Sequence, residues 1–229
     1  MKKFELTNEF ITNMFGTKLF RIRALVEFGD VEAGELGGYV EKESNLGHDD
    51  NAWVYDNAWV YGNARVYGDA QVSGDARVYD NAWVYGDAQV SGDALVYDNA
   101  WVYGDAQVSG DALVYGNARV YGNAWVYGNA WVYGNAWVYG NALVCSDEDY
   151  AYAHGFGSVN RTTTFFRLKD GGVGVRCGCF YGTLAQFRDK IRETHGETKK
   201  AQEYLMLADL MELRFEEDEN EVGNRKYVE

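Results

Sequence analysis

The sequence predicts a mainly β protein built as a parallel β-helix, a solenoid in which short strands stack coil on coil. Residues 51–146 form 16 consecutive hexads of the form Asn/Asp-Ala-x-Val-Tyr/Ser/Cys-Gly/Asp/Ser. Every hexad has Ala in second place and Val in fourth, so both side chains point to one face of a strand. The hexads that read Asp-Ala-Gln-Val-Ser-Gly begin at Asp69, Asp87 and Asp105, 18 residues apart. Three hexads therefore make one coil.

Each hexad supplies one strand and one corner. Alternation along Ala-x-Val-y places Ala and Val on the inner face and the two variable residues on the outer face. The Gly, Asn and Asp residues that follow are turn formers that tolerate left-handed backbone. Sixteen hexads give about five coils, roughly 26 Å long at about 4.8 Å per coil.

The spacing of Val54 and Ala58, repeated down the array, resembles the hexapeptide-repeat superfamily. That resemblance implies a left-handed helix of triangular coils, although parallel crossovers are normally right-handed. The run Gly37-Gly38-Tyr39-Val40-Glu41, followed by Asn45-Leu46, resembles the lead-in of phage and prophage hexapeptide-repeat proteins. The function of those proteins is mostly unassigned, and the resemblance implies a location in the cytoplasm of a bacterial host.

We divide the chain into an N-terminal cap (1–39), a solenoid (40–146), a C-terminal module (147–216) and an acidic, flexible tail (217–229). Val40 and Leu46 lie six residues apart and are expected to begin the first coil. Leu46 and Val54 lie eight apart, which implies a two-residue insertion that carries His48.

The C-terminal module is expected to be a ββαα unit. Strands are predicted over 162–168 and 173–180, joined by a turn at 169–172. A capping box of Thr183 and Gln186 opens a helix that ends at Gly196, and a second helix spans 199–215. The module caps the last coil, whose bare strand edges would invite end-to-end stacking. An oligomerisation or partner-binding module is the alternative.

The charge and the cysteines narrow the functional classes. The net charge is -14 without a basic stripe, so direct binding to a nucleic-acid backbone is not expected. Three interpretations of an acidic surface are open: it keeps the protein soluble, it binds a basic protein, or it occupies the nucleic-acid channel of another protein in place of the nucleic acid. Three cysteines at no framework spacing indicate a reducing compartment. We find no signal-peptide core and no membrane-spanning run, so a cytoplasmic protein without membrane contact is expected.

The sequence predicts no catalytic centre, cofactor or metal. Hexapeptide acyltransferases usually need a general-base histidine on a coil wall, and γ-class carbonic anhydrases need three around zinc. The three histidines, His48, His154 and His195, all lie outside the hexads. An acyltransferase using His48 or His154 remains an alternative. Cys177 and Cys179 have the wrong spacing for a zinc knuckle, and we expect both sulfurs to point into a small hairpin core.

Aromatic residues form columns when the hexads are sorted by three. One column carries Tyr61, Tyr79, Tyr97, Tyr115 and Tyr133; another carries Tyr67, Tyr85, Tyr103, Tyr121 and Tyr139, beside Arg65, Trp83, Trp101, Arg119 and Trp137. Stacked rings stabilise neighbouring coils, which is the structural interpretation. A partner-binding or self-association face and a sugar-stacking surface are the alternatives.

Aspartates form columns at the corners. Asp69, Asp87 and Asp105 stack at one corner, and Asp75, Asp93 and Asp111 at another, joined by Asp80 and Asp98. Hydrated corners, cation binding and contact with a basic protein are the three interpretations.

Together these features favour a non-catalytic scaffold that binds a macromolecule, with inhibition of a host defence or nucleic-acid-handling protein as the specific hypothesis. The candidate binding residues are Trp83, Trp101, Trp137, Tyr85, Tyr103, Tyr121, Asp75, Asp80, Asp93 and Asp98. The partner is expected to be a host protein, and a homo-oligomer is the second expectation. A structural or self-assembling spacer is the alternative function.

Overall fold

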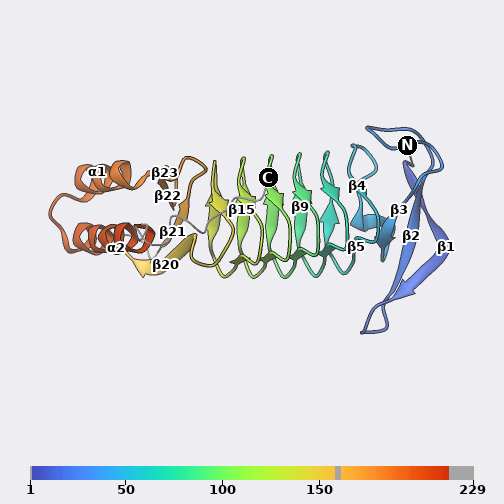
Figure 1. The fold of residues 1–229 in the computed structure, drawn as a ribbon, viewed down its shortest axis with the longest axis horizontal. Helices are drawn as coiled ribbons and strands as arrows, with labels where there is room; N and C mark the ends of the chain where they lie inside the picture. Colours follow the sequence, from blue (N-terminus) through green and yellow to red (C-terminus); the bar gives the residue numbers. More distant parts are fainter. Residues whose placement is uncertain (1, 158–160, 217–229) are drawn as a thin grey trace. The chain divides into compact units, whose positions relative to one another are not determined.

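A computed structural model describes residues 2–157 and 161–216 of the chain. The chain forms two compact units, one within residues 1–150 and the other from residue 151 on. The first unit is a β-solenoid with an N-terminal cap, and its coils appear in Figure 1 as a row of short parallel arrows. The second unit is a small sheet with two helices. The predicted solenoid is confirmed; its left hand stays a prediction.

Three parallel sheets run along the solenoid, and we name each by its outward side chains. The glutamine wall contains β4 (Trp53–Val54), β7 (Gln71–Val72), β10 (Gln89–Val90), β13 (Gln107–Val108), β16 (Trp125–Val126) and β19 (Leu143–Val144). The leucine wall contains β5 (Trp59–Val60), β8 (Arg77–Val78), β11 (Leu95–Val96), β14 (Leu113–Val114) and β17 (Trp131–Val132). The tryptophan wall contains β6 (Arg65–Val66), β9 (Trp83–Tyr85), β12 (Trp101–Tyr103), β15 (Arg119–Tyr121) and β18 (Trp137–Tyr139).

Each residue of a coil pairs with the residue 18 positions further along the chain. Gln89 pairs with Gln107 in the glutamine wall, and the Gln89 N–H donates to the Ala106 carbonyl at 2.9 Å. The same spacing pairs Trp83 with Trp101 in the tryptophan wall. The backbone of one coil is therefore satisfied by its neighbours, as buried backbone groups require.

Alanine and valine fill the interior. The Ala and the Val of every hexad are fully buried, at 0 % exposure in all 16 hexads. A column of identical small residues needs no repacking from coil to coil. The same interior therefore suits any number of coils, while the variable positions are left to face outward.

Left-handed backbone closes the corners. Gly86 has φ +72°, and a Cβ there would lie 3.0 Å from the Gly104 nitrogen of the next coil. The aspartates at the same hexad position, Asp56, Asp80 and Asp98, adopt φ values of 54°, 58° and 58°. Aspartate is one of the few non-glycine residues that tolerate this region, which is why these corners accept it.

The N-terminal cap extends the leucine wall. Strands β1 (Phe4–Thr12) and β2 (Lys18–Ala24) form an antiparallel hairpin, and β2 pairs with β3 (Leu36–Val40), which pairs in parallel with β5. A Cβ at Gly38 would lie 2.6 Å from the Ala58 carbonyl oxygen. The glycine run before Tyr39 thus lets β3 approach the first coil closely.

The first coil has the predicted insertion. Val40 pairs with Val60 and Leu46 bridges to Val66, both 20 positions apart, whereas Val54 pairs with Val72 at 18. A short 3₁₀ helix, η1 (Glu43–Asn45), precedes Leu46. The buried amide of Asn45 donates to the carbonyls of Gly62 and Ala64 at 3.2 and 2.8 Å.

The cap buries a tryptophan that the hexad pattern places outside. Trp53 is 0 % exposed, with Phe4 and Phe28 edge-on to its ring at centroid distances of 6.2 and 5.3 Å. Lys3 closes the same region because its ammonium donates to the Asp50 and Ala52 carbonyls at 2.6 and 2.7 Å. Burial lowers the pKa of Lys3 to about 8. The strand period of two predicts whether a side chain points toward the solenoid axis or away from it. It does not predict which outward side chains the N-terminal cap then covers.

The second unit contains β20 (Tyr150–Phe156), β21 (Arg161–Arg167), β22 (Val173–Cys177), β23 (Phe180–Thr183), α1 (Leu184–His195) and α2 (Lys199–Phe215). The four strands form one sheet in chain order. The predicted capping box is present, since Thr183 accepts from the Gln186 N–H, and α1 ends at Gly196. The two predicted strands thus belong to a four-stranded sheet, and the predicted tail, 217–229, lies outside the described residues.

The expected return strand over 173–180 is two strands. Gly178 has φ +59° and breaks the strand between Cys177 and Cys179. The expectation that both sulfurs point into one core was therefore wrong. Cys177 is half-buried and its sulfur lies 3.2 Å from the Thr163 hydroxyl, while Cys179 is exposed.

Two tryptophans at the same hexad position test the role of the cap. Trp53→Ala is expected to lower the free energy of unfolding by about 3–5 kcal/mol because it leaves a cavity under the cap. Trp125→Ala, in the same wall but 42 % exposed, is expected to cost about 1 kcal/mol or less. Urea unfolding of both variants checks this, and equal losses would show that the cap does not seal the first coil.

Candidate binding surface

The tryptophan wall carries a continuous ladder of outward side chains. Along one line lie Arg65, Trp83, Trp101, Arg119 and Trp137, each paired with the next through its strand. The rings of Trp83 and Trp101 are stacked, with centroids 5.4 Å apart and an interplanar angle of 11°. All three tryptophans of this line are half-buried. The stacked faces of Trp83 and Trp101 therefore cover one another, and each ring stays partly accessible from outside.

Two arginines belong to this ladder as stacking partners. The guanidinium of Arg119 lies 4.5 Å from the Trp101 ring centroid and 4.8 Å from that of Trp137. Arg65 lies 5.7 Å from the Trp83 ring. Each such cation–π contact stabilises by about 0.5–1 kcal/mol at an exposed site. Arg119 thus joins Trp137 to the stacked pair, a role that the sequence columns did not predict.

A second ladder of tyrosines runs beside the first. Successive ring centroids are 4.9, 4.8, 4.7 and 4.2 Å apart along Tyr67, Tyr85, Tyr103, Tyr121 and Tyr139. Tyr85 also meets Trp101 edge-on at 6.4 Å. The structure therefore brings six of the predicted residues onto one wall: Trp83, Trp101, Trp137, Tyr85, Tyr103 and Tyr121.

The leucine wall has a tyrosine ladder of its own, with ring centroids 5.0–5.4 Å apart along Tyr61, Tyr79, Tyr97, Tyr115 and Tyr133. Burial raises the pKa of Tyr79, and the neighbouring rings of Tyr61 and Tyr97 raise it further. Burial also raises the pKa of Tyr61, Tyr67, Tyr85 and Tyr97. The ladders therefore favour the uncharged phenol.

The four predicted aspartates do not come together. Asp75 and Asp93 lie at the corner between the glutamine and leucine walls, because each follows a glutamine-wall strand. Asp80 and Asp98 lie at the next corner, between the leucine and tryptophan walls. The prediction that Asp80 and Asp98 join the Asp75 column was wrong, because a leucine-wall strand, β8 or β11, lies between the two aspartates of each hexad.

Asparagines stack on the corner that carries Asp80 and Asp98. Side-chain amides donate from each coil to the next at 3.2–3.4 Å along Asn63, Asn81, Asn99, Asn117 and Asn135. The Asp98 carboxylate accepts from the Gly116 N–H of the next coil at 3.2 Å. Asp98 thus links coils, which adds a structural role to its place beside the tryptophan wall. The recurrence of Asn every third hexad is the sequence signal that could have identified this ladder.

These repeats match a known family. The matched segments are residues 58–70, 70–86, 88–104, 106–120, 114–128, 118–134 and 124–140. The family is the YdcK β-solenoid repeat. All matched residues lie within the hexads, so the similarity concerns the coils and their walls. No curated protein matches the chain.

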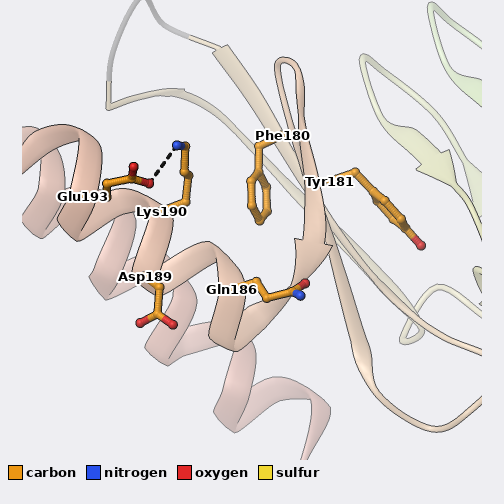
Figure 2. Close-up of a pocket in the computed structure, with 6 residues that line it drawn as sticks. All are labelled: Phe180, Tyr181, Gln186, Asp189, Lys190 and Glu193. Atoms are coloured by element: carbon orange, nitrogen blue, oxygen red, sulfur yellow. Dashed lines mark hydrogen bonds and ion pairs between the residues drawn. The ribbon is translucent and has the colours of Figure 1, made fainter.

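Outside the matched repeats, we consider two surface pockets formed by described residues of the second unit. Figure 2 shows the larger one, about 500 Å³, between α1 and β23. Its Lys190 is paired with Glu193 at 2.8 Å, and Asp189 is paired with Arg192 at 3.3 Å. Each charged group of this pocket is therefore paired with another side chain of α1.

The other pocket, about 290 Å³, has a mixed lining of apolar, polar and charged side chains: Arg161, Cys177, Cys179, Phe180, Phe187, Lys190, Ile191, Thr194, His195 and Tyr204. Within residues 2–157 and 161–216, no group of three or more His, Cys, Asp or Glu side chains is placed to hold a metal ion. In the same described ranges, no helix is long and apolar enough to cross a membrane.

The histidines lie outside the YdcK-type repeats. His48 stacks on Phe4 at 4.4 Å and accepts from the Lys3 backbone N–H at 3.2 Å, and burial lowers its pKa. His154 lies 3.0 Å from the Thr162 hydroxyl, and His195 stacks on Tyr204 at 5.9 Å. His48 thus packs within the N-terminal cap, while the other two belong to the second unit.

The tyrosine ladders predict an alkaline limit to stability. A phenol whose pKa is raised on folding stabilises the native state below the unfolded pKa of 10.0, and this contribution is lost as pH rises through the folded value. We therefore expect thermal unfolding temperatures to fall above about pH 10. Tyr79→Phe should make that fall shallower, because it removes the phenol flanked by two others. An unchanged slope in the variant would contradict a ladder contribution.

Proposed function

We propose that this protein is a non-catalytic scaffold whose tryptophan wall binds a partner protein. The observation that carries the proposal is the ladder of Arg65, Trp83, Trp101, Arg119 and Trp137, ordered before any partner arrives. Tryptophan, tyrosine and arginine are the residue types enriched in binding hot spots. The wall presents all three in adjacent lines.

Preorganisation makes this wall suited to binding. A protein interface loses about 0.5–1.5 kcal/mol for each flexible side chain that it immobilises. Stacking on the neighbouring coils already restricts the rings of Trp83 and Trp101, so a partner meets side chains that have little freedom left to lose. Rigid aromatic side chains supply contact area at low entropic cost for the same reason in antibody paratopes.

The corners on both sides of the wall indicate the character of the partner. Asp80 and Asp98 flank one edge, and Asp69, Asp87 and Asp105 flank the other. An apolar centre with a charged rim is the usual anatomy of a protein interface. The complementary surface is therefore an apolar patch edged by lysine or arginine, which the acidic corners would attract over several ångströms.

A host protein in the cytoplasm of a bacterium is the specific partner we propose. The lead-in run at Gly37-Gly38-Tyr39-Val40 is similar to that of phage proteins, and the net charge of -14 suits a basic target. Proteins that handle nucleic acids present such basic surfaces. Occupying that surface would inhibit a host defence or nucleic-acid-handling protein by competing with its substrate.

A structural spacer is the second candidate. From Val54 on, the coils keep one register, which makes this part of the solenoid regular. On its leucine wall, Trp131 and Tyr133 are 47 and 39 % exposed. Exposed rings on a second wall favour self-assembly, in which a copy of the chain covers them.

The binding proposal predicts that substitutions in the tryptophan wall reduce partner binding, whereas substitutions in the other two walls do not. Trp83→Ser with Trp101→Ser should remove a dominant, nuclease-resistant protein captured from bacterial lysate by the tagged chain, as read by mass spectrometry. Trp125→Ser with Trp131→Ser is the matched control, because it also removes two tryptophan rings, which lie on the other two walls and are 42 and 47 % exposed. Circular dichroism verifies that both variants keep the solenoid.

Three outcomes separate the candidates. Loss of the captured protein in the first variant alone supports the tryptophan wall. Equal capture by both variants refutes it. Recovery of the tagged chain alone, as a defined oligomer, favours the spacer.

A further inference from the structure

The pocket of about 290 Å³ in the second unit differs in charge from the chain as a whole. Arg161, Lys190 and His195 line it, and none of the described residues around it is Asp or Glu. The whole chain, by contrast, carries a net charge of -14. A basic lining in so acidic a protein favours an anionic ligand, because these groups attract a negative charge that the rest of the surface repels.

Four aromatic rings line the same pocket. Phe187 and Tyr204 are buried and meet edge-on, with ring centroids 5.8 Å apart. Phe180 lies against Phe187 at 5.4 Å, and His195 stacks on Tyr204 at 5.9 Å. Such rings favour a flat aromatic ligand, which can stack on them or meet them edge-on. The volume is close to the lower limit of roughly 300 Å³ for ligand pockets, which leaves room for about two fused rings and not for a nucleotide.

Arg161 is the side chain that can bind the charge of such a ligand. Among the described residues, nothing forms a hydrogen bond or an ion pair with its guanidinium. A Cβ at Gly178 would clash with this guanidinium, so the glycine leaves the space in which the Arg161 side chain lies beside the pocket. Lys190, by contrast, is held by Glu193 at 2.8 Å, as Figure 2 shows.

One free guanidinium suits a carboxylate better than a phosphate. A carboxylate carries a single negative charge, and its two oxygens accept two parallel hydrogen bonds from the planar fork of an arginine. A phosphate monoester carries a charge of about -1.5 to -2 at neutral pH, and a second free cation would be needed to match it. The pairing of Lys190 with Glu193 makes that side chain a poor second partner.

We propose that this pocket binds a small aromatic carboxylate. The aromatic part of the ligand lies among the rings of Phe180, Phe187 and Tyr204, and its carboxylate binds the Arg161 guanidinium. The inference goes beyond the proposed function, because the pocket belongs to the second unit and does not depend on the tryptophan wall.

Isothermal titration calorimetry of the full chain with 2-naphthoate tests the proposal. The wild type should bind one equivalent with a dissociation constant below about 1 mM, which is ordinary for so small a ligand. The uncharged analogue 2-naphthamide has the same rings without the negative charge. It should bind about tenfold more weakly or less tightly still, because its hydrogen bond to the guanidinium has only one charged partner.

Two arginine variants test the role of the guanidinium. Arg161→Gln should weaken the binding of 2-naphthoate about tenfold or more, because it removes the charged hydrogen-bond donor. Arg192→Gln is the matched control: Arg192 lies on α1 outside the pocket lining and is paired with Asp189 at 3.3 Å. It should bind 2-naphthoate like the wild type. Thermal unfolding verifies that both variants are folded.

The cysteines give a second readout that locates the ligand. Cys177 is half-buried and lines the pocket, so a bound ligand should cover its sulfur. At ten times the dissociation constant about 90 % of the pockets are filled, and alkylation of Cys177 by iodoacetamide should slow about tenfold. Cys145 lies in the first unit and should react at an unchanged rate, as mass spectrometry of the separate peptides can show. In Arg161→Gln the same 2-naphthoate concentration should protect Cys177 much less.

Four results overturn the proposal. The first is the absence of saturable binding of 2-naphthoate up to about 10 mM, ten times the expected limit. The second is equal affinity for 2-naphthoate and 2-naphthamide, and the third is an equal loss of affinity in Arg161→Gln and Arg192→Gln. The fourth is binding that leaves the alkylation of Cys177 unchanged, because the ligand would then lie outside this pocket.

Discussion

The pairing of each residue with the one 18 positions along is the constraint on which the solenoid depends. Hydrogen bonds such as that from Gln89 to Ala106 satisfy the backbone of every coil, and they hold only while each coil has the same length. The interior meets this requirement with Ala and Val alone, fully buried in all 16 hexads. Because Ala and Val repeat every six positions, the core requires the six-residue repeat but does not determine which hexad lies in which wall. That order is left to the outward residues.

The outward residues use this freedom to make three different surfaces. Arg119 between two tryptophan rings, the tyrosine stacks and the asparagine ladder each connect like positions of successive coils. Such contacts stabilise the stack, and they also fix the surface that a partner would meet. Stability and binding therefore draw on the same side chains, so a variant of Trp83 or Trp101 must be judged by both its folding and its binding.

The columns could be predicted from the sequence because they follow from period and spacing. Val40, Leu46 and Val54 even located the two-residue insertion, and Thr183 with Gln186 located the start of α1. What could not be predicted depends on contacts between distant segments. Trp53 reads as an outward residue, but Phe4 and Phe28 cover it. The division of Asp75 from Asp80 follows from the hexad, because the strand Arg77–Val78 lies between them. The break at Gly178, by contrast, needed a backbone angle that residue type permits but does not require.

The interior of the solenoid has a period of six residues, and its surface has a period of 18. Two deletions separate these periods: residues 105–122, a whole coil whose removal leaves Trp83 paired with Trp101, and residues 87–92, one hexad. Both keep the interior pattern, so far-ultraviolet circular dichroism should show both chains folded. Near-ultraviolet circular dichroism of the stacked rings is the decisive measurement. The whole-coil deletion should keep that signal, reduced by one coil, while the hexad deletion should lose much of it because Trp101 moves off Trp83. Equal signals in the two chains, or an unfolded whole-coil deletion, would contradict the account.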